Sequence, residues 1–105
     1  MGYIRHDAII VVGWDASLER AHAHAAGLSL PVSEIVISPL NHYRSFLIAP
    51  DGSKEGWEES EKGDWARQAW KDWIKQQEDF YVDWVHVSLA GDEATDTRIV
   101  EQGRQ

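Results

Sequence analysis

The chain has 105 residues, 43% hydrophobic and 27% charged, which fits one globular domain with its own core. It contains no cysteine, which excludes disulfides, thiolate zinc sites and thiol nucleophiles. The net charge of −8 disfavours direct binding to a nucleic-acid backbone, and no apolar run approaches the ~18–20 residues of a membrane span. We therefore expect a cytoplasmic protein with a single α+β domain over residues 1–100 and a polar tail over 101–105.

The N-terminal part of the chain predicts a strand followed by a helix. Residues 8–12 form a continuous β-branched run, which indicates a strand that is central in its sheet or buried on both faces. A helix should follow, with Asp15 or Ser17 as its N-terminal cap and Gly27 as its stop signal. Apolar residues spaced three and four apart give this helix one buried stripe.

The middle of the chain predicts two strands and a second helix. The strands, at residues 34–38 and 43–49, should be antiparallel neighbours because a four-residue turn joins them. A Pro-Asp-Gly-Ser turn follows, and an acidic, solvated loop then runs to about residue 62. The second helix should begin at a capping Asp64 and end over residues 76–79.

The last part of the chain predicts one strand at residues 82–89, and residues 95–100 are a candidate fifth, edge strand. The element order is therefore β-α-β-β-α-β with an optional final strand. This order predicts a ferredoxin-like two-layer sandwich, in which two helices cover one face of an antiparallel sheet.

Recognisable catalytic and metal-binding motifs are missing from the sequence. It lacks GxSxG, SxxK, HExxH and the glycine-rich phosphate loops, so we assign no catalytic residue, metal ligand or cofactor. A catalytic triad needs no sequence signature, because the fold alone can assemble it. In that alternative the protein is a small hydrolase that uses His6 or His42.

Six tryptophans are the most unusual feature of so short a chain. Trp70 and Trp73 lie on the apolar stripe of the second helix, and Trp84 lies on an alternating strand, so all three are expected in the core. The other three fall at junctions between elements, where binding sites collect. These three are Trp14, Trp57 and Trp65. An exposed indole there could stack on a planar ring, and core packing is the alternative.

We predict a contact surface where cations, histidines and aromatic residues meet these junctions. Its members are Arg5, His6, Trp14, His42, Tyr43, Arg44, Lys54 and Trp57. A cation beside an indole could pair with a phosphate while the indole stacks on the ring, which suits a small anionic ligand. Ordinary turn and strand-edge chemistry accounts for the same residue types.

Three segments resemble a family of small uncharacterised proteins encoded by bacteriophages of actinobacteria. The segments are YIRHDAIIV at residues 3–11, NHYRSFLIAPDGSKEGW at 41–57 and DTRIV at 96–100. The family has no assigned activity, so the resemblance supplies no catalytic residues and implies only expression inside a bacterial host. Small accessory phage proteins of this kind often bind a host protein or blunt a host defence.

We therefore expect a non-enzymatic phage accessory protein that acts by binding a host protein or a small anionic ligand, as in counter-defence. Two alternatives stand beside the hydrolase. One is a protein that sequesters a nucleotide signal in a Trp-lined pocket, and the other is an inhibitor that mimics the charge of DNA. A homodimer is a further expectation, because an acidic domain with apolar edge strands can pair through a sheet edge.

Overall fold

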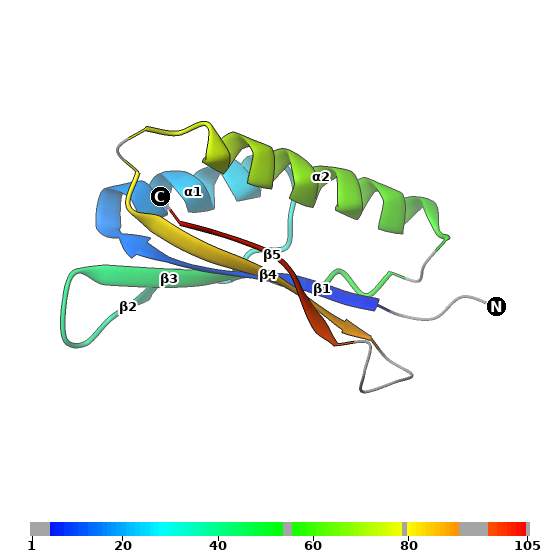
Figure 1. Cartoon of the computed structure of the whole chain (residues 1–105), viewed down its shortest axis with the longest axis horizontal. Coiled ribbons are helices and arrows are strands. Elements are labelled where there is room, and N and C mark those ends of the chain that lie inside the picture. The colour runs from blue at the N-terminus through cyan, green and yellow to red at the C-terminus, as the bar shows by residue number, and fades with distance from the viewer. Residues whose placement is uncertain (1–4, 54–55, 79, 91–96, 105) are drawn as a thin grey trace.

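The structure is a computed structural model that describes residues 5–53, 56–78, 80–90 and 97–104. Two helices lie on one face of a five-stranded antiparallel sheet, so the fold is α+β with two layers (Figure 1). The strand order across the sheet is β2-β3-β1-β4-β5. In chain order the elements are β1 Arg5–Trp14, α1 Asp15–Gly27, β2 Val36–Ile37, β3 Tyr43–Ile48, α2 Glu58–Lys75, β4 Val82–Ala90 and β5 Arg98–Arg104.

Strand β1 lies at the centre of the sheet, as predicted, with β3 on one side and β4 on the other. Its side chains alternate in burial. Ile9 and Val11 are fully buried beneath the helices, whereas Ile10 and Val12 are exposed. The helices therefore cover only one face of β1, and burial on both faces does not occur.

Helix α1 packs through the predicted stripe, because Leu18, Ala21 and Ala25 are all fully buried. The predicted N-terminal cap was wrong, since Trp14 holds the capping position and no side chain caps the helix. The chain passes directly from the last residue of β1 into α1, and the Trp14 N–H donates to the Tyr81 carbonyl at 2.9 Å. Ser17 instead accepts a hydrogen bond from the Tyr81 N–H at 3.3 Å.

Helix α2 begins at Glu58, six residues before the predicted start at Asp64, so residues 58–62 of the expected acidic loop are helical. Three acidic residues lie in the first turn, where the positive end of the helix dipole favours negative charge. The acids that resemble a solvated loop in sequence therefore stabilise the start of the helix. In the described residues no helix is both long and apolar enough to cross a membrane.

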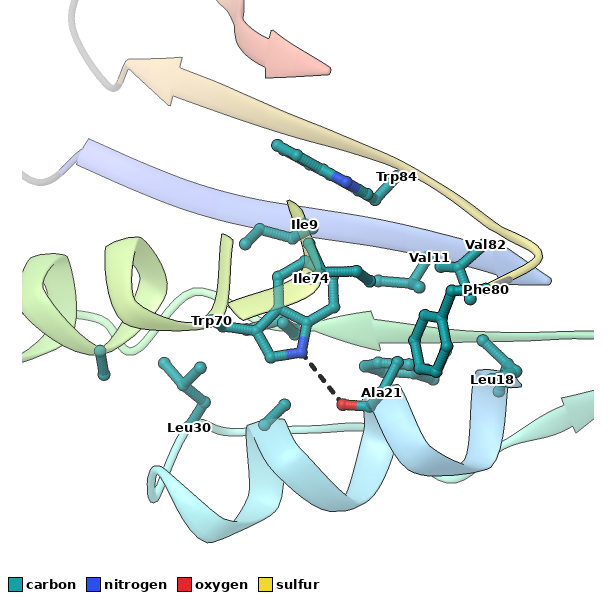
Figure 2. Packing of buried hydrophobic residues seen from close by; sticks show 14 residues of the cluster. Ile9, Val11, Leu18, Ala21, Leu30, Trp70, Ile74, Phe80, Val82 and Trp84 are labelled. Atoms are coloured by element: carbon teal, nitrogen blue, oxygen red, sulfur yellow. Dashed lines mark hydrogen bonds between the residues drawn. The ribbon is translucent and has the colours of Figure 1, made fainter. Parts of the chain in front are cut away.

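The core lies between the helices and the covered face of the sheet (Figure 2). Trp70 is fully buried and donates from Nε1 to the Ala21 carbonyl at 3.0 Å, which ties α2 to α1. Trp70 also meets Trp84 edge to face, with ring centroids 6.0 Å apart. The predicted core positions of Trp70 and Trp84 are confirmed. Trp73 is half-buried and stacks on His24, with ring centroids 4.1 Å apart.

The two edge strands differ in length from the prediction. Strand β2 has only two residues, Val36 and Ile37, where five were expected. Strand β5 continues through residues 101–104, which were expected to form a polar tail. The indole of Trp84 lies directly against Gly103, and a Cβ at that position would collide with it. Glycine therefore allows the end of β5 to lie close to the core.

Candidate functional site

The predicted contact surface divides between two ends of the molecule. Trp14 ends β1 beside the start of β3, which brings it together with His42 and Tyr43. Arg5 begins β1, and Trp57 precedes α2, whose first turns lie over that opposite end of the sheet (Figure 1). Lys54 lies outside the described residues. Trp14 and Trp57 consequently do not line one common pocket.

One group of predicted residues does form a cluster, which we call the aromatic corner: Trp14, His42 and Tyr43. The rings of Trp14 and Tyr43 stack nearly parallel, with centroids 5.1 Å apart and planes 7° apart. The His42 ring lies 5.6 Å from Trp14, tilted by 37°. Trp14 remains 38% exposed, so the corner presents an aromatic surface to solvent.

Arg44 follows the aromatic corner in sequence, but its side chain lies on the other face of the sheet. Its guanidinium donates to Glu19 on α1 at 2.9 Å. Alternation along a strand explains the separation, because successive side chains point to opposite faces. Arg44 therefore joins β3 to α1 and does not extend the aromatic corner.

The aromatic corner continues into a larger apolar surface, which we call the open face. It consists of the side chains that point away from the helices on alternate strand positions. Its members are His6, Ala8, Ile10, Val12, Trp14, Val36, Tyr43, Ser45, Leu47, Asp83, Val85, Val87, Leu89, Ile99 and Gln102. The register places Ile10 between Leu47 on β3 and Val85 on β4, and Ile10 is 46% exposed. Both described helices lie on the other side of the sheet, as Figure 1 shows.

Two shallow hollows interrupt the open face. One, of about 570 Å³, is lined by Ile10, Val12, Val85 and Gln102 among others. The other, of about 520 Å³, lies beside the aromatic corner and is lined by Val36 and Tyr43 among others. Aliphatic and aromatic residues form about half of each lining, together with polar residues such as Asp83 and Asn41, so both hollows could take apolar groups with a polar edge.

The open face is nearly free of acidic side chains. The described strands contain three acidic residues, Asp7, Asp83 and Glu101. Asp7 and Glu101 bond to residues on the covered side, so only Asp83 points outward. The charge of −8 is therefore carried mainly elsewhere in the molecule.

A second feature, which we call the charged network, lies between α2 and the covered face near the start of β1. The Asp7 carboxylate bonds to His86 Nε2 at 3.0 Å, and His86 Nδ1 bonds to Lys71 Nζ at 2.9 Å. Lys71 Nζ also lies 3.1 Å from Glu101 Oε1, and Lys75 pairs with the same carboxylate. Four elements, β1, α2, β4 and β5, are thereby connected.

Arg67 extends the charged network toward the start of α2. It is 4% exposed and pairs with Asp64, and it lies 3.8 Å from Asp7 and 3.9 Å from Asp51. Burial by itself would raise the pKa of Asp7. The hydrogen bond with His86 and the positive charges of Arg67 and Arg5 outweigh burial, so the pKa of Asp7 lies below its ordinary value of 3.8.

The hydrogen bonds fix the proton on His86. A lysine ammonium can only donate, so Nδ1 of His86 accepts from Lys71 and Nε2 must carry the proton that is donated to Asp7. Both ring nitrogens are then engaged within the protein, although a cavity of about 230 Å³ adjoins them. The described residues contain no cluster of three or more metal-ligating side chains. This arrangement suits a structural connection better than proton transfer to a substrate.

Sequence reasoning missed the charged network because its members come from distant parts of the chain. Asp7, Lys71, His86 and Glu101 share no motif or periodic spacing. The one available signal was His86 on the buried side of an alternating strand, where an imidazole requires polar partners. That signal indicates a satisfied histidine but does not identify its partners.

In comparisons with known proteins, no family model, curated protein or solved structure matches the chain.

Proposed function

We propose that the protein is a non-enzymatic binding protein whose contact surface is the open face, with the aromatic corner at one end. The observation that carries this proposal is an apolar sheet face that no described element covers. Ile10, Leu89 and Ile99 are 46%, 45% and 61% exposed on it. Contiguous apolar patches larger than a few hundred Å² are rare on monomers and mark sites of interaction.

The shape and charge of the open face favour a protein over a small anionic ligand. Its hollows are shallow, and a small ligand needs a pocket that encloses most of its surface. Three cations that could hold an anion are engaged within the protein: Arg44 with Glu19, and Arg67 and Lys71 in the charged network. The partner that fits is a protein with a broad, apolar surface that carries few charges.

The alternatives receive less support from the geometry. Sequestration of a nucleotide needs Trp14 and Trp57 in one pocket, and they lie toward opposite ends of the sheet. Mimicry of DNA needs rows of free carboxylates, whereas Asp7, Asp64 and Glu101 pair with cations. A hydrolase needs an oriented histidine, and within the described residues the His–Asp pair forms at His86, whose two nitrogens are engaged.

The same proposal extends to the fold and the setting. We propose that the sheet is a ferredoxin-like arrangement widened by β5, because the order β2-β3-β1-β4 is antiparallel throughout and β5 adds to the β4 edge. In the phage setting that the sequence resemblance implies, the protein would act in the cytoplasm of the host, and a host protein would be one partner of suitable chemistry.

An affinity experiment with matched variants tests the proposed function. The wild-type chain, Ile10→Lys and Trp65→Lys are immobilised and exposed to bacterial lysate and to free wild-type chain. Ile10 lies in the middle of the open face, whereas Trp65 is 68% exposed on α2, in the helical layer. We expect Ile10→Lys to lose its protein partner, because a central charge must be desolvated on contact. Trp65→Lys should retain it.

Circular dichroism and thermal unfolding establish that each variant is folded before the comparison is made. A protein retained equally by wild type and Ile10→Lys, but lost with Trp65→Lys, would move the contact surface to the helical layer and contradict the proposal.

A further inference from the structure

The distribution of charge indicates how two copies of this acidic chain could approach one another. Both helices carry acidic side chains, among them Glu19 on α1 and Asp72 on α2, and both helices lie on the same side of the sheet (Figure 1). On the opposite side only Asp83 is acidic among the strand residues. If two copies met through their open faces, both sheets would lie between the two helical layers. The distance between the two layers would then exceed the Debye length of about 8 Å at physiological ionic strength, so repulsion between their acidic side chains would be largely screened.

The size of the open face is that of a small specific interface. The five strands contain 34 residues in all, and β2 contributes only two of them. At a rise of about 3.3 Å per residue and a strand spacing of about 4.8 Å, the face measures roughly 550 Å². Two such faces bury roughly 1,100 Å² together, just above the lower bound of about 1,000 Å² for a specific interface.

The open face carries a hollow and projecting side chains, the two features that a self-complementary interface combines. In such an interface each copy presents the same patch, so the patch must fit itself. This face carries a hollow of about 570 Å³ together with projecting aliphatic side chains such as Leu47 and Ile99, which are 36% and 61% exposed. Twisted sheets pack face to face about 10 Å apart through such side chains.

We propose that a second copy of this chain covers the open face, giving a face-to-face homodimer with the helices on its outer sides. This inference rests on the proposed function and names the protein that occupies the contact surface. It differs from pairing through a sheet edge, because here side chains and not backbone groups form the contact.

Sedimentation velocity over roughly 1–200 μM protein tests the dimer. We expect the wild-type chain to approach twice its 11.9 kDa mass. Ile10→Lys, and independently Val85→Lys beside it, should raise the dissociation constant at least ~30-fold, as expected for central interface residues. Trp65→Lys should leave the dissociation constant within about twofold of wild type, because Trp65 lies on α2.

The outcomes separate this inference from the proposed function. A wild-type chain that stays monomeric at 200 μM overturns the homodimer. If the affinity experiment nevertheless shows another protein lost with Ile10→Lys, the open face remains the contact surface and only its occupant changes. A dimer that survives both lysine substitutions in folded protein also overturns the inference, because a different surface must then hold the copies together.

Discussion

At the scale of the residue, Lys71 illustrates how one buried charge joins several elements. Its Nζ lies 2.9 Å from His86 on β4 and 3.1 Å from Glu101 on β5, while its side chain is 4% exposed. The two contacts compensate for removing an ammonium from water, which is costly without partners. Lys71 is therefore one of the buried charges that connect α2 with the covered face of the sheet.

Replacing Lys71 with methionine should lower the free energy of unfolding by about 1–3 kcal/mol, because His86 Nδ1 is left without its donor and Glu101 loses one of two cations. Urea denaturation measures the change. Lys62→Met is the matched control on the same helix, since Lys62 is 73% exposed and its pair with Glu58 should contribute less than about 0.5 kcal/mol. Equal effects of the two substitutions, or a more stable Lys71→Met, would show that the buried ammonium does not support the fold.

At the scale of the element, Glu101 is the residue that fastens the edge strand β5 to α2. Its carboxylate pairs with both Lys71 and Lys75, one helical turn apart on α2. The hydrogen bond with Lys75 is the main cause that lowers the pKa of Glu101 below its ordinary value of 4.5; burial opposes the shift, and Lys71 adds to it. The attachment of β5 should therefore depend on pH.

The sign of that dependence follows from proton linkage. Above pH 4.5 Glu101 is ionised in the folded and unfolded chains, so its stabilisation is fully present. As the pH falls from 4.5 through the lower folded pKa, the unfolded chain takes up the proton first and the stabilisation is lost. Glu101→Gln should be less stable than wild type at pH 7, and the difference in melting temperature should shrink below pH 4.5. Glu34→Gln, a charge removal in an exposed loop, should show no such convergence.

The elements themselves could largely be predicted from local pattern, whereas the exposure of their faces could be predicted only in part. The alternation in β4 correctly predicted a core position for Trp84, and His86 lies on the same buried face. The continuous apolar run of β1 gave no sign that Ile10 would face solvent, because that depends on which side both helices pack. The start of α2 was missed because acids and Gly63 resemble a loop in sequence, although helix N-termini favour acids.

The candidate site was predictable only where its residues lie close together in the sequence or pair across neighbouring strands. The aromatic corner combines His42 and Tyr43, which are adjacent, with Trp14, which pairs with Tyr43 in the sheet. Trp57 and Arg5 were grouped with them by residue type and by position near junctions between elements, and the fold places them toward the other end of β1. Distance in a folded sheet depends on strand order, which single-residue chemistry does not encode.

At the scale of the whole molecule, most acidic side chains lie away from the open face, and this arrangement affects how copies of the chain associate. A net charge of −8 keeps copies of the chain apart in most orientations. The open face provides the one approach, among the surfaces that the described strands form, in which apolar burial is gained with few acids brought together. In the proposed homodimer, repulsion disfavours other geometries, which favours a closed dimer over open-ended aggregation.

This separation predicts an unusual response to salt. An interface held by ion pairs weakens as sodium chloride rises, because screening reduces attraction between opposite charges. In the proposed dimer the remaining long-range force is repulsion between two chains of charge −8, so screening should help association. We expect the dissociation constant to fall a few-fold between 50 and 500 mM sodium chloride, as measured by sedimentation equilibrium. A steep rise over the same range would mean that opposite charges hold the copies together, and it would contradict an apolar, face-to-face contact.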